Sequence, residues 1–530
     1  MKSVLAIDQG TTGTTALVIS ADGRVAGRGY QEITQHYPAP GWVEHDADEI
    51  LERTLIAARD AIAASGVKPD VIGITNQRET VVVWHRDTGK PLARAIVWQD
   101  RRTTERCAQL KNKTKWIAER TGLRPDPYFS ATKIEWLLKR PEIAFVARNG
   151  RLLAGTIDSW LIWKLTGGRV HATDPTNASR TLLFDINRLR WSRELCDLFK
   201  IPPEILPEVR PSAGDFGRTL PSFFGKSMPI TGVAGDQQAA LFGQGCFGPG
   251  QAKNTYGTGA FLLLNTGKKV PRAGEGLLAT VACDEKGGAA YALEASIFIA
   301  GAAIQWLRDG LGVLFNAAES ERLAASLESN DGVYFVPALV GLGAPNWEPR
   351  ARGTIVGLTR GSNRAHLTRA ALEAMAYGTA EMLSVMAKRS RVKFESLRVD
   401  GGASANNWLM QFQSEVLGIP VERPDMIETT ALGAAGLAGI AGGVWRDASE
   451  FMGTRSFTRF TPAMPSEAAS EWIAGWQRAV RASLAWARDA GDQSGKSAGP
   501  KSSKPRKRQT GKTGKRKSVV AKKTTRARRR

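Results

Sequence analysis

The chain opens with two apolar runs that predict strands joined by a turn of small and hydroxyl residues. Residues 3–7 and 16–20 are largely apolar, and the stretch DQGTTGTT between them holds one carboxylate, Asp8, followed by glycines and threonines. Short apolar runs bounded by glycine or polar clusters are typical of buried strands. The pattern therefore places an acid and a row of Gly and Thr residues at the tips of two strands.

Farther along the chain, short apolar runs alternate with patterns of helical period, which predicts an α/β protein. One helix stands out, because TALGAAGLAGIAGG (430–443) consists of small residues and is suited to close packing against a neighbour. The further strands are expected at 70–77, 79–86, 230–234, 254–267 (after a Thr/Gly turn) and 396–400, and the helices at 48–64, 130–140, 157–167, 236–242, 366–388, 408–417 and 430–443.

The Gly/Thr turn occurs twice, once early in each half of the chain. Both AIDQGTTGTTALVIS (6–20) and NTYGTGAFLLLNTG (254–267) put Gly and Thr at the ends of strands. A chain of 530 residues is also too long for one ordinary domain. We therefore expect two related α/β domains that meet at a cleft.

The net charge of +22 suggests a nucleic-acid-binding protein until its location is considered. Residues 496–530 hold sixteen Lys or Arg and no acid, which leaves 57 basic against 51 acidic residues in the rest of the chain. A basic tail without aromatic residues cannot bury a core, so we expect it to be disordered. Two interpretations remain open: non-specific contact with nucleic acid or another polyanion through counterion release, and a solvated tail without a dedicated partner.

The four cysteines are far apart and form no C-x-x-C pair. This spacing favours reduced thiols in the core of a cytoplasmic protein over a disulfide framework or a metal site. The apolar run Val4 to Ile7 is too short for a signal peptide, and no apolar window is long enough to span a bilayer. We expect a cytoplasmic protein without membrane contact.

Two carboxylates occupy positions where chemistry is conceivable, and each has a structural alternative. Asp8 with the Gly/Thr turn can bind phosphate and a cation, or the segment can be a tight hairpin turn with an Asx-type cap. Asp236 in GVAGDQQAALFG lies between a predicted strand and a predicted helix. It can be the N-cap of that helix or a general base at the mouth of a cleft.

Arg78 and Glu79 form a charged pair at a predicted strand junction, in NQRET. Such a pair is usually a surface ion pair, but at a junction it can bind the hydroxyls of a polyol. The aromatic residues Trp98, Tyr128 and Phe261 each lie beside polar runs. Any one of them alone is more typical of packing than of ligand contact.

Ten segments in this order resemble the FGGY carbohydrate kinases, most closely the branch that phosphorylates glycerol. They are AIDQGTTGTTA, TNQRET, VWQDRR, DPYFSATK, AGDQQAALFGQ, NTYGTGAF, IAGAAIQWLRD, GLGAPNW, LRVDGGASANNWLMQ and TALGAAGLAG. The resemblance implies an α/β protein with the actin-like ATPase fold, in which two RNase-H-like domains enclose a central cleft. It divides the chain into an N-terminal kinase domain at 1–245, a C-terminal kinase domain at 246–490 and the basic tail at 491–530.

The resemblance also implies a role for individual residues. Glycerol would be phosphorylated to sn-glycerol 3-phosphate by ATP and Mg²⁺, with Asp236 as catalytic base and Asp8 near the metal. Relatives form dimers or tetramers, so we expect self-association. The acceptor site would consist of Arg78, Glu79, Trp98, Tyr128, Asp236, Gln237 and Phe261, and the nucleotide site of Gly10, Thr11, Thr12, Gly13, Thr258, Gly259, Gly301, Gln305, Gly402 and Asn406.

The sequence departs from the family pattern in the first turn and in the tail. Many relatives have Ser where this chain has Gly13 and Arg where it has Thr15. A missing cation near the ATP phosphates would weaken nucleotide use without removing the base or the acceptor contacts. Two alternatives therefore stay open: a kinase for another small polyol or sugar, and a nucleic-acid-associated protein with a degenerate kinase body.

Overall fold

The computed structural model describes residues 2–496, and side chains as far as residue 489. The chain divides into two units, residues 1–487 and residues 488–530. The last helix, α17 (Ser466–Lys496), ends where the description ends. The predicted disordered tail begins at residue 491, but α17 continues to Lys496, so the prediction is wrong for residues 491–496. The rest of the predicted tail, 497–530, lies outside the described part of the chain.

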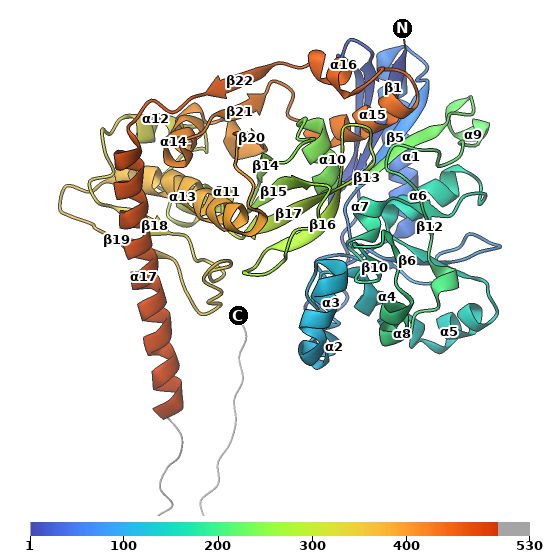
Figure 1. Cartoon of the computed structure of the whole chain (residues 1–530), viewed down its shortest axis with the longest axis horizontal. Coiled ribbons are helices and arrows are strands. Elements are labelled where there is room, and N and C mark those ends of the chain that lie inside the picture. The colour runs from blue at the N-terminus through green and yellow to red at the C-terminus, as the bar shows by residue number, and fades with distance from the viewer. Residues whose placement is uncertain (1, 497–530) are drawn as a thin grey trace, which may run out of the picture. The chain divides into compact units, whose positions relative to one another are not determined.

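Two mixed sheets form the centre of the first unit, and they share one strand order. The first runs β3-β2-β1-β5-β13, and the second contains β17-β15-β14-β20-β21, with β16 and β22 at its edges. In each, three antiparallel strands are followed by two strands parallel to the central one. Figure 1 shows β1 and β5 in blue and β14, β15 and β17 in green. The repeated Gly/Thr turn thus reflects a repeated topology, which confirms the prediction of two related α/β halves.

The strands of the two sheets have the following bounds. The first sheet consists of β1 (Ser3–Gln9), β2 (Gly13–Ser20), β3 (Val25–Glu32), β5 (Val71–Asn76) and β13 (Ile230–Gly235). The second consists of β14 (Gln251–Tyr256), β15 (Ala260–Gly267), β16 (Leu278–Cys283), β17 (Ala289–Ile297), β20 (Ser396–Asp400), β21 (Val421–Pro424) and β22 (Phe457–Phe460). Short two-stranded pairs join β4 (Glu44–His45) with β7 (Ala95–Ile96), β6 (Val82–His85) with β8 (Leu152–Gly155), β9 (Ala172–Thr173) with β12 (Glu208–Val209), β10 (Phe184–Asp185) with β11 (Arg190–Trp191), and β18 (Tyr334–Val336) with β19 (Thr354–Val356).

Helices cover the sheets, and local sequence signals set their ends. Asp46 caps α1 by accepting from the backbone N–H groups of Asp48 and Glu49, and Gly66 ends it in the left-handed region at φ 65°. The helices before the second sheet are α1 (Ala47–Ser65), α2 (Thr104–Gln109), α3 (Thr114–Thr121), α4 (Ser130–Leu138), α5 (Pro141–Arg148), α6 (Ile157–Leu165), α7 (Pro175–Ala178), α8 (Arg193–Phe199), α9 (Pro221–Phe224) and α10 (Asp236–Gly243). The others, apart from α17, are α11 (Gly301–Gln305), α12 (Glu319–Ala325), α13 (Arg364–Ser390), α14 (Asn407–Leu417), α15 (Thr429–Ala441) and α16 (Ala448–Gly453), and the short turns are η1 (Lys111–Lys113), η2 (Pro203–Ile205), η3 (Trp306–Gly310) and η4 (Gly402–Ala405).

The small-residue helix α15 packs on the first sheet and on α10 at very short range. A Cβ atom at Gly433 would lie 1.7 Å from the carbonyl oxygen of Ala239, and one at Gly243 would lie 2.1 Å from that of Thr429. On the sheet side, a Cβ at Gly73 of β5 would lie 2.2 Å from the carbonyl oxygen of Ala434. The predicted close packing is therefore confirmed, and it involves a helix from late in the chain on the sheet formed by the chain's beginning.

The predicted strand at 79–86 is shorter than expected. The structure places β6 at Val82–His85, because Glu79 has φ 64° and the chain turns there rather than remaining extended. The segment between β20 and α14 contains the single turn η4. The segment 254–267 contains the end of β14, a turn and β15 rather than a single strand. Elsewhere the predicted strands and helices are present, with ends that shift by a few residues.

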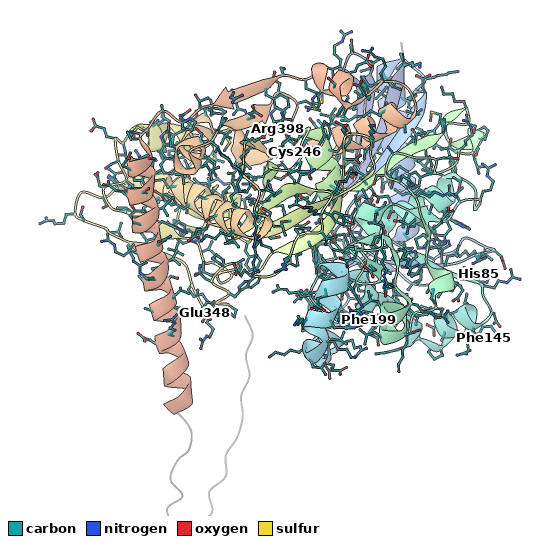
Figure 2. The ribbon with its side chains drawn as sticks, in the orientation of Figure 1. His85, Phe145, Phe199, Cys246, Glu348 and Arg398 are labelled. Carbon is teal, nitrogen blue, oxygen red and sulfur yellow. The ribbon has the colours of Figure 1, made fainter. Side chains whose placement is uncertain are left out.

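The cysteines are free and buried, as expected for core thiols. Burial raises the pKa of Cys107 to about 11 and that of Cys246 to about 12, so these thiols stay protonated and unreactive near neutral pH. Figure 2 labels Cys246, which follows α10, and Arg398 on β20.

Within residues 2–496, no helix combines the length and the apolar character that a bilayer crossing requires.

Candidate active site

The candidate residues of the first half meet at one edge of the first sheet. Strands β1, β5 and β13 are parallel, so their carboxyl ends lie together. Asp8 is near the end of β1, Arg78 and Glu79 follow β5, and Asp236 follows β13. Ligands of open α/β sheets commonly bind outside such strand ends. The fold thus gathers the charged residues of three distant segments into one place.

The turn between β1 and β2 is tight and is anchored from two sides. The N–H of Gly10 donates to the carbonyl oxygen of Gly13 over 2.9 Å, which leaves Thr11 and Thr12 at the tip. Trp98 donates from its indole Nε1 to the hydroxyl of Thr11 over 2.9 Å. A Cβ at Gly13 would lie 2.6 Å from the carbonyl oxygen of Gln31 on β3, so no larger residue fits without a shift of that strand. The hairpin alternative is thus correct for the backbone, and Thr12 remains exposed.

Asp8, near the end of β1, carries a carboxyl group with a raised pKa. Burial raises the pKa of its carboxyl group from 3.8 to about 7, and the negative charge of Asp236 contributes further. Among residues 2–496 the structure shows no hydrogen bond to this carboxylate, so it is not the Asx-type cap that the hairpin alternative required. Within the same range, no three His, Cys, Asp or Glu side chains gather into a metal-binding group. A cation beside Asp8 would therefore need ligands from a bound molecule as well.

The raised pKa of Asp8 makes a pH-dependent prediction for stability. In the unfolded chain the carboxyl group ionises near 3.8, whereas in the folded protein it stays neutral up to about 7. Below pH 3.8 the carboxyl group is neutral in both states and does not lower the free energy of unfolding. As pH rises from 3.8 to about 7, only the unfolded chain ionises, so the free energy of unfolding falls. The variant Asp8→Asn, neutral at every pH, is expected to have the same Tm as wild type at low pH and a higher Tm above neutrality. Thermal denaturation in metal-free buffer across this range measures the difference, and an equal difference at both ends would contradict the prediction.

Arg78 is held by acceptors on every side of its guanidinium group. Its two Nη atoms donate to Glu294 over 2.6 and 3.2 Å, and they also contact Gln238 at 3.3 Å and the Tyr128 hydroxyl at 3.4 Å. Its Nε lies 3.1 Å from a carboxylate oxygen of Asp236. Burial disfavours the positive charge of Arg78, but the negative charges of Glu294 and the neighbouring acids have the larger effect. They raise the pKa of Arg78 well above its usual value. The sequence-based alternative of a surface ion pair is therefore wrong.

Glu79 occupies a strained backbone position that its neighbours stabilise. It has φ 64°, in the left-handed region that non-glycine residues rarely adopt. Its carbonyl oxygen accepts from the Ser130 hydroxyl over 3.1 Å and from the Lys133 ammonium over 3.3 Å. Arg180 binds its carboxylate over 2.7 Å. Burial lowers the pKa of Lys133 to about 7, because the charged ammonium is poorly solvated there. Such shifted pKa values are common at functional sites.

Asp236 is the first residue of α10, and its carboxylate is the accessible acid of the cluster. One oxygen accepts from the backbone N–H of Gln237 over 2.7 Å, and about a third of the side chain is exposed. Gln237 accepts a hydrogen bond of 2.5 Å from the ammonium of Lys253 on β14. The N-cap of α10 is Gly235, without a side-chain cap, so the interpretation of Asp236 as the N-cap is wrong. Its carboxylate stays partly accessible beside Arg78, which leaves the interpretation as a general base open.

An aromatic-lined cavity of about 510 Å³ adjoins this cluster. Trp98 and Tyr128 meet edge to face with ring centroids 5.5 Å apart. All three predicted aromatic residues belong to the lining, and the wall also includes side chains from the second half of the chain. Its members include Trp98, Tyr128, Phe261, Glu294, Phe298 and Trp347.

The second Gly/Thr turn is tied to the start of α11. The N–H of Gly301 donates to the carbonyl oxygen of Gly257 over 3.0 Å, and the N–H of Ala302 donates to that of Thr258 over 3.1 Å. A Cβ at Gly301 would lie 2.7 Å from the Gly257 oxygen, so the approach requires a glycine. Thr258 is exposed at the tip, and Gln305 is exposed at the end of α11.

The loop after β20 lies beside the loop after β14, because the two strands are parallel neighbours. A Cβ at Gly401 would lie 2.3 Å from the carbonyl oxygen of Tyr256, whereas Gly402 faces open space. Asn406 caps α14 by accepting from the N–H of Leu409 over 2.8 Å, and its amide also contacts Ser320. The amide of Asn406 thus has a structural role, and of the two glycines Gly402 leaves room for a ligand.

Sequence reasoning missed four charged or polar residues of the cluster. Two of them, Lys253 and Glu294, lie in strands whose other residues are mostly buried, and a charge at such a position requires a partner. That pattern could have marked them as candidates, although it could not have named their partners. The four missed residues are Arg180, Gln238, Lys253 and Glu294.

Comparison with known proteins agrees with this geometry. The chain matches the FGGY family of carbohydrate kinases, the N-terminal domain over residues 3–243 and the C-terminal domain over residues 252–442. It is 54% identical to glycerol kinase 2 of Thermotoga maritima over 493 residues, which is 92% of this chain and 99% of that protein. It is 55% identical to glycerol kinase of Carboxydothermus hydrogenoformans, again over 92% of this chain and 99% of the relative.

Solved structures show the same similarity. A crystal structure of Plasmodium falciparum glycerol kinase with ADP superimposes with a TM-score of 0.87 at 37% identity, covering 91% of this chain and 98% of that one. The expected fold class, an α/β protein with two domains of the FGGY kinase type, is thereby confirmed. The duplicated sheets, the clustered carboxylates and these matches lead to one conclusion: the chain belongs to the FGGY family of carbohydrate kinases.

Proposed function

We propose that this protein transfers the γ-phosphoryl group of ATP to glycerol and produces sn-glycerol 3-phosphate. The observation that carries the proposal is the contact of 3.1 Å between Asp236 and Arg78 beside the aromatic-lined cavity. An accessible carboxylate next to a fixed cation supports a site for a small polyol here. The relatives at 54% and 55% identity, both named glycerol kinase, support the choice of acceptor.

Glycerol has three hydroxyl groups and little apolar surface, so its site must supply directed hydrogen bonds. Asp236 and Glu79 provide acceptors, and the Nε–H of Arg78 provides a donor beside them. The rings of Trp98 and Phe261 would bound the carbon chain and restrict longer sugars. Gln237, next to the carboxylate of Asp236, adds a polar group at the same edge.

Asp236 serves as the general base in this proposal. Its carboxylate accepts the proton of one terminal hydroxyl as the oxygen of that hydroxyl attacks the γ-phosphorus, and ADP leaves with the electrons of the broken P–O bond. Arg78 holds the carboxylate in place through its Nε. Alignment by such fixed groups supplies much of the rate enhancement in phosphoryl transfer.

The nucleotide would lie between the two Gly/Thr turns. Thr11, Thr12 and Gly13 from the first turn and Thr258 from the second present backbone N–H and hydroxyl groups to the phosphates. Further contacts to the adenosine part and the phosphates would come from Gly301, Gln305, Gly402 and Asn406. The half-buried carboxylate of Asp8, which accepts no hydrogen bond from the described residues, fits Mg²⁺, which when bound neutralises charge on the phosphates.

The test of the proposal is ADP release by the purified protein with ATP and Mg²⁺. Glycerol, xylulose, ribulose and erythritol are compared with no added acceptor. Strong turnover that depends on glycerol supports the assignment. Preference for another acceptor would keep the phosphoryl transfer but replace glycerol, and absence of turnover with every acceptor would favour a degenerate kinase body.

Thr15 offers a test of nucleotide use. It lies opposite Asp8 in the β1–β2 register, so the two side chains are on the same face of the sheet at the same edge. The variant Thr15→Arg adds a cation there and is expected to lower the KM for ATP about two- to tenfold while leaving the KM for glycerol unchanged. Thr14→Ser, which alters the opposite, buried face, is the control. Steady-state kinetics decides, and an unchanged or higher KM for ATP would count against the prediction.

Three further expectations belong to the proposal. The protein acts in the cytoplasm, without membrane contact. It assembles into a dimer or tetramer. The basic segment 496–530 contacts nucleic acid or another polyanion non-specifically, in a manner that salt suppresses.

A further inference from the structure

We propose that Glu294 is a positioning residue for the acceptor site: a carboxylate from the second sheet that fixes the two arginines holding Asp236 and Glu79. The proposal rests on the proposed function, because it concerns the site assigned there to glycerol. It adds a residue that lies on β17, more than 200 positions along the chain from Arg78.

Glu294 makes three short charged hydrogen bonds. Arg78 grips it with both Nη atoms, over 2.6 Å to Oε2 and 3.2 Å to Oε1, and Arg180 donates to Oε1 over 2.9 Å. Two-point contact between a guanidinium and a carboxylate fixes their relative orientation as well as their distance. Glu294 therefore determines the direction in which the rest of Arg78 points.

The cluster is buried, so its charges must be matched. The side chains of Glu294, Arg78 and Arg180 are at most 2% exposed. The two arginines overcome the cost of burial and hold the pKa of Glu294 at about 2, so its carboxylate is charged at every working pH. Removing one partner from a buried ion cluster leaves an uncompensated charge. Neutralising Glu294 would thus release both arginines to seek other acceptors.

The acceptors that remain are the acids proposed to bind the substrate. Arg180 already binds Glu79 over 2.7 Å, and Arg78 lies 3.1 Å from Asp236 and 3.7 Å from Glu79. Without Glu294, both guanidinium groups would move toward these two carboxylates and occupy the oxygens that would accept from glycerol. By binding both arginines, Glu294 thus leaves oxygens of Asp236 and Glu79 free to accept hydrogen bonds from glycerol.

The position of Glu294 is rigid because of its strand. It lies in the middle of β17, which is paired on one side with β15 and on the other with β16. Strand β15 begins with the segment that carries Phe261, another member of the cavity wall. The second sheet therefore supplies both an apolar wall and the counter-ion that orients the charged groups of the first.

The test compares Glu294→Gln with a matched control, Glu373→Gln. Glu373 is also a glutamate at most 2% exposed, and it is bound by Arg369 over 2.8 Å on α13. Steady-state kinetics with glycerol and ATP is combined with thermal denaturation of all variants. Glu294→Gln is expected to raise the KM for glycerol about tenfold or more and to change the KM for ATP less than about twofold. Glu373→Gln is expected to leave the kinetic constants unchanged.

A folded Glu294→Gln variant with the KM for glycerol of wild type would overturn the positioning role while leaving the kinase assignment intact. Equal increases in both KM values would also overturn it, because they indicate general loosening. If Glu294→Gln does not fold, Glu294→Asp and Arg180→Lys provide the same comparison, since they retain the charges but alter the geometry. Absence of glycerol-dependent turnover in the wild type would instead overturn the proposed function itself, and with it this role.

Discussion

Asp236→Asn is expected to lower kcat by about 10²–10⁴-fold, with little change in the KM for ATP, because the variant cannot take the proton of the attacking hydroxyl. Asn preserves the size of the side chain and can still accept from the N–H of Gln237, the 2.7 Å contact that anchors the carboxylate. The start of α10 should therefore remain in place. Pre-steady-state kinetics, which separates phosphoryl transfer from product release, measures the effect.

The matched control is Asp126→Asn. Asp126 lines the aromatic-lined cavity beside the cluster of Asp236, and it is paired with Arg101 over 3.0 Å. An amide there can still accept from the backbone N–H of Tyr128, so kcat should stay within about threefold of wild type. If kcat of Asp126→Asn fell as far as that of Asp236→Asn, the reaction would depend on the negative charge near the cavity and not on Asp236 as a base. A kcat of Asp236→Asn close to wild type would remove the assigned role.

The parts of the site that short segments encode could be predicted from the sequence. The first turn, the acid at the start of α10 and the turn after β14 each occupy one local stretch, and the structure brings them to the strand ends where the strand pattern placed them. The repeated Gly/Thr turn predicted two related halves, because both copies join the same two strands of the same topology. The nucleotide contacts beyond the turns depended on the resemblance and stay predictions.

The parts that depend on distant pairing could not be predicted. Glu294 meets Arg78 and Arg180 only after β17 has joined the second sheet in a register that the sequence does not reveal. The packing of α15 was predicted, but its partner was not, because small residues permit close contact with many surfaces. Glu79 was assigned to a strand, and nothing in its residue type signalled the left-handed backbone that Ser130 and Lys133 stabilise.

The close packing of α15 leads to the second large effect. Gly433→Ala is expected to destabilise the protein, because the added Cβ would lie 1.7 Å from the carbonyl oxygen of Ala239 and 2.4 Å from its carbon. These are backbone atoms of α10, so no side-chain rotation can relieve the clash, and the two helices must separate. Overpacking of this kind costs about 1–3 kcal/mol or more, against a gain of about 1 kcal/mol from the higher helix propensity of Ala.

The effect should extend to activity, because α10 begins with Asp236 and any displacement of the helix moves the base. We expect Gly433→Ala to lower both Tm and kcat. Gly453→Ala in α16 is the matched control, since a Cβ there meets nothing within 4 Å and should leave both quantities near wild type. Thermal denaturation and steady-state kinetics of the two variants measure the difference. If Gly433→Ala is as stable and as active as Gly453→Ala, the helices can separate at no cost, and the close contact of α10 with α15 does not position the base.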